Sequence, residues 1–259
     1  AELRALGSGT HYAKVTGNIT LENDAYFIIN GTLTLDLNGH TITYAPPAEK
    51  CVGQSVFRCE DNANFTLMDS KGGGKITFAH LGETYTGTGT EAGETPYSRA
   101  YAVGVRKNST FTMKGGTIEN FGNTSDFGAT VYVNPLNASN HPSFNMEGGV
   151  IQNCQTNPSQ GSGAAVWARG TNATVNISGG TIQNCNAGNN GGAIYACGAR
   201  VNITGGQILN CSAQSGGAIY AENYSSTTTD TAQGPSNVTI SGSAKISGNR
   251  AGTYGKGGA

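Results

Sequence analysis

The stretch VNITGGQILNC, residues 201–211, nearly repeats VNISGGTIQNC, residues 175–185. The same unit recurs as FTMKGGTIENF at 111–121 and FNMEGGVIQNC at 144–154, and in degenerate form at 33–44, 65–78 and 238–249. After a polar loop, two copies are followed by a second block, GGAIYA, at 191–196 and 216–221. The core unit is constant while the loops vary, so that successive copies start 26 to 46 residues apart. This combination is typical of a solenoid, in which each repeat forms one coil and stacks on its neighbours.

Three short strands are expected in each coil. In the first strand, Val201 and Ile203 alternate with polar residues, which places the apolar side chains inside. A Gly-Gly pair then turns the chain, because glycine accepts positive φ angles and has no Cβ atom at the corner. The second strand carries one apolar anchor, such as Ile208, and the third strand is the Gly-Ala-Ile-Tyr-Ala block. The sequence therefore predicts an all-β, right-handed parallel β-helix, forming one domain over residues 1–259.

Two further positions recur from coil to coil and are expected to form ladders. Residues at one position of a parallel stack lie about 4.8 Å apart and point the same way, which is a poor arrangement for disulfide bonds. The expected ladders are a buried thiol column of Cys154, Cys185 and Cys211, and a column of turn amides from Asn120, Asn153, Asn184 and Asn210. For Cys51 and Cys59, a disulfide that bridges a loop remains an alternative to free thiols.

Composition narrows the class of protein. Charged residues make up 12% of the 259 residues, about half the usual share, and 40 residues are glycine. The net charge of −1 argues against nucleic acid or an electrostatic membrane surface as the partner, and no apolar run is long enough to insert into a bilayer. The four histidines, His11, His40, His80 and His141, lack metal-ligand spacing, so no metal site is predicted. Abundant Asn, Thr, Ser and Gly suit an extracellular or cell-surface β protein.

The repeats resemble those of known β-helix families. LDLNGHTIT, residues 35–43, is similar to the first complete coil of pectate-lyase-like right-handed β-helix proteins. The pairing of ILNC with GGAIYA resembles the FxxN and GGAI repeats of polymorphic outer-membrane proteins and related bacterial surface adhesins, although Ile208 stands in place of Phe and Cys211 in place of Asn. The resemblance implies a secreted or surface-exposed bacterial β-helix. It leaves the activity open, because this superfamily includes lyases, hydrolases, adhesins and tailspikes.

A column of aromatic residues in the third strand is the most suggestive candidate site. Alignment of the third-strand blocks places Gly104 level with four rings, which are Tyr132, Trp167, Tyr195 and Tyr220. If the neighbouring Val and Ile residues face inward, the rings face outward as an exposed stripe. Loops at 45–54, 79–99, 134–143 and 222–237 flank this face, so a walled groove for an extended polysaccharide or glycoprotein glycan is expected. Two alternatives remain: the rings stack only to stabilise the coils, or the register is reversed and they are core.

Catalytic candidates are sparse. Glycoside hydrolysis needs carboxylates across the scissile bond, and a lyase of this superfamily uses carboxylates with calcium and a basic residue. The weak candidates are Glu119, Asp126, Arg106 and Arg169. Arg106, Lys107, Arg169 and Arg200 also suggest a basic strip beside the aromatic column, with solvated turn residues as the alternative. No cofactor is expected, and calcium is expected only if the protein is a lyase.

Residues 1–20 are predicted to supply an N-terminal cap, and the last residues resemble the start of another GGAI block, as in a fragment of a longer solenoid. The favoured function is an adhesin-like glycan-binding module. A polysaccharide lyase or glycoside hydrolase in the same groove, or a purely structural stalk, are the alternatives. An enzyme should show converging carboxylates, a binder should show exposed rings, and a stalk should show buried rings.

Overall fold

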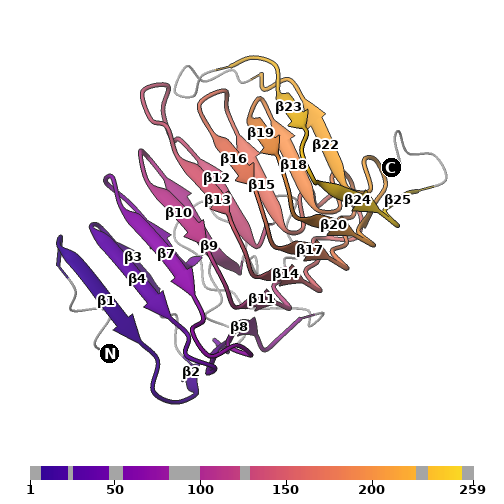
Figure 1. The fold of residues 1–259 in the computed structure, drawn as a ribbon. Coiled ribbons are helices and arrows are strands. Elements are labelled where there is room, and N and C mark those ends of the chain that lie inside the picture. Colours follow the sequence, from indigo (N-terminus) through magenta and orange to yellow (C-terminus); the bar gives the residue numbers. More distant parts are fainter. Residues whose placement is uncertain are drawn as a thin grey trace.

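The chain folds as a right-handed parallel β-helix with three strands in each coil (Figure 1). The computed structural model describes residues 7–22, 26–46, 55–81, 100–122, 129–225 and 233–252. Those residues contain no helix, and hence none long and apolar enough to cross a membrane. The coils stack along one axis from the indigo N-terminal end to the yellow C-terminal end, so the three large β-sheets run along the solenoid. The fold predicted from the repeats is confirmed.

Strands from equivalent parts of successive coils form three parallel sheets, named here A, B and C. Sheet A contains β1 (Thr10–Lys14), β4 (Thr32–Asp36), β7 (Asn64–Met68), β10 (Thr110–Met113), β13 (Ser143–Met146), β16 (Thr174–Ile177), β19 (Arg200–Ile203) and β23 (Asn237–Ile240). Sheet B contains β2 (Ile19–Leu21), β5 (Thr41–Tyr44), β8 (Lys75–Phe78), β11 (Thr117–Glu119), β14 (Val150–Gln152), β17 (Thr181–Gln183), β20 (Gln207–Leu209) and β24 (Lys245–Ser247).

Sheet C, which carries the candidate site, is formed by the third strand of each coil. It contains β3 (Phe27–Ile29), β6 (Ser55–Cys59), β9 (Tyr101–Arg106), β12 (Val131–Asn134), β15 (Val166–Arg169), β18 (Ile194–Cys197) and β22 (Ile219–Glu222). A small additional pair, β21 (Ser212–Ala213) and β25 (Arg250–Ala251), lies outside these three sheets.

The repeat predicts the register of the strands. Val175 pairs with Val201 and Ile177 with Ile203, as the alignment of the two copies requires. In sheet B, Ile182 pairs with Ile208. All these side chains are buried, because period-two alternation turns the same positions of every coil toward the axis.

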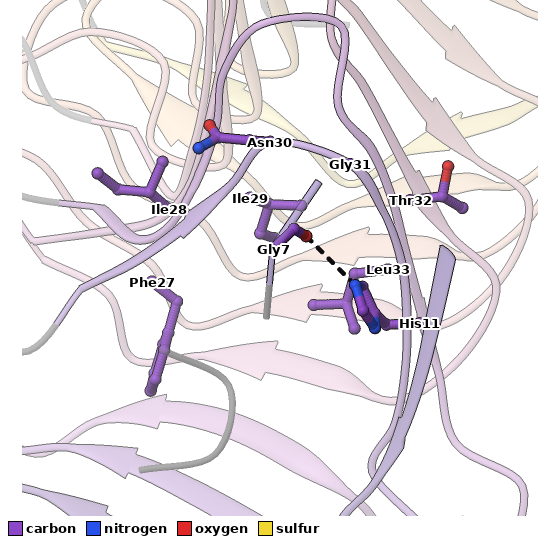
Figure 2. A pocket seen from close by; sticks show the side chains of 9 residues that line it. All are labelled: Gly7, His11, Phe27, Ile28, Ile29, Asn30, Gly31, Thr32 and Leu33. Atoms are coloured by element: carbon purple, nitrogen blue, oxygen red, sulfur yellow. Dashed lines mark hydrogen bonds between the residues drawn. The ribbon is translucent and has the colours of Figure 1, made fainter. Parts of the chain in front are cut away.

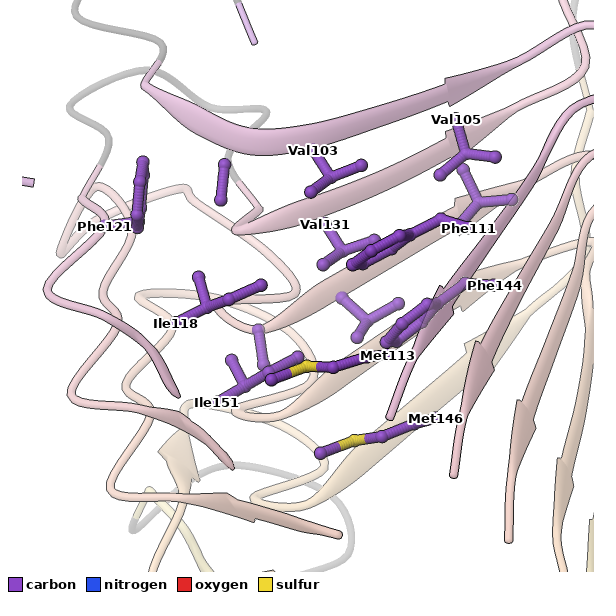
Figure 3. Close-up of a cluster of buried hydrophobic side chains, with 14 of the residues drawn as sticks. Val103, Val105, Phe111, Met113, Ile118, Phe121, Val131, Phe144, Met146 and Ile151 are labelled. Carbon is purple, nitrogen blue, oxygen red and sulfur yellow. The ribbon is translucent and has the colours of Figure 1, made fainter. Parts of the chain in front are cut away.

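The core is a stack of apolar side chains along the axis (Figure 3). In sheet A, Phe65, Phe111 and Phe144 stack with ring centroids 5.1 and 5.2 Å apart. The next coil places Val175 in the same column. Each aromatic pair adds about 0.5–1.5 kcal/mol beyond the area that it buries, so the N-terminal half of the core gains from ring stacking and the later coils rely on aliphatic packing.

The Gly-Gly turns are required by close contact between coils. Gly180 has a φ of 77°, in the left-handed region that side chains disfavour. A Cβ atom on Gly179 would lie 2.2 Å from the backbone oxygen of Glu147 in the preceding coil. The pair therefore meets two separate demands, a left-handed backbone and a close approach of one coil to the next.

Both predicted ladders are present. The amide column of Asn120, Asn153, Asn184 and Asn210 occupies the turn after sheet B, each residue with a φ of 54–63°. The thiols of Cys154, Cys185 and Cys211 are free and buried, and each donates to the carbonyl oxygen two residues earlier, at 3.1, 3.3 and 3.4 Å. Cys59 is likewise a free, buried thiol, whereas Cys51 lies outside the described residues.

The predicted terminal features are only partly described. Within the expected cap of residues 1–20, β1 joins sheet A and β2 begins in sheet B, while residues 1–6 lie outside the described residues. The GGAI-like residues 257–259 also lie outside them.

Candidate functional site

The candidate site is a row of aromatic rings on the outer face of sheet C, here called the aromatic ladder. Its members are Tyr101, Tyr132, Trp167, Tyr195 and Tyr220. The last four are paired in register across β12, β15, β18 and β22. The inward neighbours of these strands, such as Val131 and Ile194, belong to the core, so alternation turns the rings outward. The predicted direction of the column is confirmed, and the reversed register is wrong.

The rings stack on one another along the solenoid axis. Their centroids are 5.5 Å apart between Tyr101 and Tyr132, and 4.8 Å apart between Tyr132 and Trp167. The remaining two pairs, which continue through Tyr195 to Tyr220, are 6.0 and 6.1 Å apart, and all four interplanar angles lie between 18° and 33°. Neighbouring rings thus lie with their faces toward each other at a moderate tilt.

Exposure differs along the ladder, which corrects the expectation of a uniformly exposed stripe. Tyr132 and Trp167 are buried, with 9% and 6% of their surface exposed. Tyr195 and Tyr220 are half-buried. Strand alternation fixes which side of a sheet a ring occupies but does not fix what packs over it. The C-terminal half of the ladder, Tyr195 and Tyr220, is therefore called the open end below.

Tyr101 is a member of the ladder that sequence alignment misses. Alignment places Gly104 in the column, and Gly104 does pair in register with Tyr132. Gly104 has no side chain, and a Cβ atom there would lie 2.4 Å from the Ser55 hydroxyl oxygen. The ring of Tyr101, three residues earlier, stacks on Tyr132 instead. An aromatic residue shortly before a glycine that interrupts a column is the signal that could have revealed it.

A second outward column lies two residues beyond the ladder, on the same face of sheet C. Arg169, Cys197 and Glu222 are paired in register across β15, β18 and β22. The carboxylate of Glu222 accepts hydrogen bonds from the Tyr195 hydroxyl and, at 3.7 Å, from the Cys197 thiol. Both donors remain protonated near neutral pH. Burial, together with the neighbouring Glu222, raises the pKa of Tyr195, and the same causes raise that of Cys197 to about 11.

Arg169 is held by Tyr224, which lies far from it in sequence. Its guanidinium group donates to the Tyr224 hydroxyl and lies over the Tyr224 ring, 4.9 Å from the centroid. Burial alone would lower the pKa of Arg169, but the hydrogen bond to Tyr224 and the nearby Tyr132 outweigh burial and raise the pKa above its ordinary value, so the group stays charged. Tyr224 is itself fixed by an antiparallel bridge to Gly234. Tyr224, two residues after the end of β22, thus lies against Arg169 on the outer face of sheet C.

Of the four weak catalytic candidates, the three that the structure describes do not converge. Glu119 lies on sheet B, where it forms an ion pair with Lys75 at 3.0 Å and accepts from the Gln152 amide at 2.8 Å. Arg106 and Arg169 lie on sheet C. Asp126 lies outside the described residues. Glu119 is thus a member of a side-chain ladder on a different face from the two arginines.

The predicted basic strip is interrupted. Arg106 and Lys107 lie 3.5 and 3.4 Å from the carboxylate oxygens of Glu60, so an acidic partner neutralises this part of the strip. Arg200 begins β19 in sheet A and not in sheet C. Of the four basic residues, Arg169 is the one that lies against the ladder.

Comparisons with known proteins add no relative: no protein-family model, no curated protein and no solved structure matches the chain. In the part of the chain that the structure describes, no group of three or more His, Cys, Asp or Glu side chains is placed to hold a metal ion. The residues of the site itself therefore carry the functional argument.

A small hollow, drawn in Figure 2, is lined by residues between Gly7 and Leu33 and so lies at the N-terminal end of the solenoid, far from the open end (Figure 1). Within it, the His11 ring lies 3.2 Å from the backbone oxygen of Gly7, and the space holds roughly one water molecule. The lining is Gly7, His11, Phe27, Ile28, Ile29, Asn30, Gly31, Thr32 and Leu33. This hollow is too small for a glycan, so the ladder remains the candidate site.

Proposed function

We propose that the chain is a secreted or cell-surface bacterial β-helix module, adhesin-like, that contacts glycan at the open end of its aromatic ladder. The observation that carries the proposal is the pair of half-buried, registered rings of Tyr195 and Tyr220 beside the Glu222 carboxylate. Aromatic rings next to a hydrogen-bonding carboxylate are a frequent combination in glycan sites, since the ring takes the apolar face of the sugar and the acid takes its hydroxyl groups.

The stacking geometry limits where a sugar can bind. The inner rings have both faces against neighbouring rings, so a sugar cannot stack on them without separating the ladder. Among the described residues, Tyr220 is the last ring of the ladder, and Tyr195 is the one ring that stacks on it. The proposed contact is therefore a short site at one end and not a continuous groove along the whole column.

The resemblance to pectate-lyase-like coils and to GGAI-containing surface proteins supports a surface role. An enzymatic role has less support, because Glu119 lies on another sheet from the ladder and its carboxylate is already bonded to Lys75 and Gln152. A structural stalk is the stronger second candidate, and the burial of Tyr132 and Trp167 favours it.

A glycan array with the purified chain, with and without calcium, tests the proposal. Each hit is assayed for new reducing ends and for unsaturated product. Binding without turnover is the expected result, and Tyr220→Ala should reduce it at least about tenfold, because it removes the ring that the sugar would contact. Tyr195→Ala should also weaken binding, because it removes the ring that stacks on Tyr220 and the hydroxyl that donates to Glu222. Ile28→Ala is the matched control, because Ile28 is an exposed apolar residue at the N-terminal end of the same outward column.

Each other outcome has a defined meaning. Turnover of a glycan would show that the protein is a lyase or a hydrolase and not only a binding module. Absence of binding to any glycan, with an intact fold, would favour the stalk. An equal loss of glycan binding in Tyr220→Ala and Ile28→Ala would show that the glycan does not bind at the open end.

A further inference from the structure

The charge at the open end indicates which class of glycan it takes. We infer that the site selects glycans with a free ammonium group, that is, amino sugars whose nitrogen is not acetylated, because Glu222 places a carboxylate with no cationic partner among the described residues beside Tyr220. This inference rests on the proposed function and names the ligand class of the same site.

Glu222 has only neutral hydrogen-bond partners among the described residues. Its hydrogen-bond donors are the Tyr195 hydroxyl and the Cys197 thiol, both neutral. No described Lys, Arg or His nitrogen lies within 4.0 Å of its carboxylate. The carboxylate is also half-buried, so solvent and salt screen its charge less than they would at a fully exposed position.

Arg169 is the cation in the same column as Glu222. Cys197 lies between them in register, so the two residues are two strand spacings apart, about 9.5 Å between backbones. The guanidinium group is occupied by the ring and the hydroxyl of Tyr224. Arg169 thus has Tyr224 as its partner, and it does not form an ion pair with Glu222.

Glu222 and Tyr220 lie on the same face of β22. They are two residues apart on β22, so both side chains project from the same side of the strand. An ammonium group located there meets a carboxylate and an aromatic ring together, and each attracts a cation. An N-acetylated sugar offers the carboxylate only neutral hydrogen-bond donors, and a uronate is repelled by Glu222. The predicted order of affinity is therefore cationic, then neutral, then anionic.

The test compares three oligosaccharide probes of equal length by isothermal titration calorimetry. They are glucosamine oligomers, N-acetylglucosamine oligomers and galacturonate oligomers. The wild-type chain should bind the glucosamine oligomers at least about fivefold more tightly than the acetylated ones, as expected for one partly exposed ion pair with an aromatic contact. Added salt should reduce this ratio toward one, because screening weakens the charge term and leaves the ring contact.

Glu222→Gln should abolish the preference while keeping the binding of the acetylated oligomers, since a glutamine oxygen still accepts from Tyr195. Glu147→Gln is the matched control: it removes the same charge from an exposed residue whose partner is Lys114, at 3.7 Å. Glu147→Gln should keep the preference.

Two results would overturn the inference and leave the proposed function standing: equal affinity of the wild type for both neutral and cationic probes, or an undiminished preference in Glu222→Gln. Binding of none of the three probes would count against both. If Glu222→Gln fails to fold, the salt dependence of the wild-type preference decides, because a preference that salt does not weaken excludes charge selection.

Discussion

Ser70 donates both its backbone N–H group and its hydroxyl to the carboxylate of Asp36, one coil earlier, at 2.9 and 2.7 Å. The Tyr12 hydroxyl and the Asn38 N–H group donate to the same carboxylate, at 2.8 and 2.9 Å. Asp36 is fully buried and thereby ties three successive coils together. Burial alone would raise the pKa of Asp36, but the hydrogen bonds from Ser70, Tyr12 and Asn38 outweigh it and hold the pKa well below its ordinary value.

Asp36→Asn is expected to lower the free energy of unfolding by about 1–3 kcal/mol at pH 7, because an amide cannot accept from all four donors. A lowered pKa stabilises the fold at pH values above the ordinary aspartate pKa of about 3.9, and this contribution is lost as the pH falls below that value. The difference between wild type and variant should therefore shrink from pH 6 toward pH 2 in urea titrations. Asp61→Asn is the control, since Asp61 is exposed and its ion pair with Lys107 contributes little. A constant difference across pH would contradict this account.

Asn184→Ala should destabilise the protein by about 1–2 kcal/mol, whereas Asn184→Gly should be close to neutral. Asn184 has a φ of 54°, a conformation that alanine disfavours and glycine accepts. Gly248 occupies the equivalent place two coils later, with a φ of 70°. Thermal unfolding of both variants measures the effect. If alanine and glycine gave the same midpoint, backbone conformation would not be what the column supplies.

The buried thiols should resist alkylation until the protein unfolds. In a Cys51→Ala background, Cys197 should react first in native protein, because it is half-buried while the thiols of Cys154, Cys185 and Cys211 are fully buried. Its reaction rate should rise steeply from pH 8 toward pH 11, since its pKa is raised to about 11 and the thiolate is the reactive form. Mass spectrometry of partially labelled protein measures the order. Early labelling of Cys185 would show that the core opens locally.

Trp167→Ala should lower the free energy of unfolding by about 3–5 kcal/mol, because it leaves a gap in the middle of the stack. Tyr220→Ala should lower it much less, because Tyr220 is half-buried and stacks on one ladder ring. Trp167→Phe, which keeps a ring in place, is the control, and denaturant unfolding followed by circular dichroism measures all three. Comparable losses in Trp167→Ala and Tyr220→Ala would mean that the ladder does not stabilise the fold through its centre. Binding experiments therefore belong with Tyr220 and not with Trp167.

Much of the fold could be predicted because the repeat is copied almost letter for letter. Once Val175 and Val201 are aligned, the positions of the thiol column and of the amide turns follow, since a parallel stack keeps its register from coil to coil. The left-handed turn at Asn184 is part of the same pattern.

The candidate site was less predictable, because its contacts cross variable loops. The repeat indicates that Trp167 faces outward but carries no information on what covers it. The contact between Arg169 and Tyr224 joins residues 55 positions apart, one of them outside the repeated unit. The interaction of Glu222 with Tyr195 depends on a strand pairing that the repeat does predict, and it could have been found by reading the column two residues beyond the rings.

Because Val175 and Val201 occupy the same column, the length of the solenoid can change by whole coils. Removal of residues 175–200 would join Thr174 to Val201 and leave each remaining side chain in its old column, with the solenoid shorter by one strand spacing of about 4.8 Å. Duplication of the same segment would lengthen it by one spacing. The length of such a protein can therefore change during evolution in fixed increments of one coil, without a new fold.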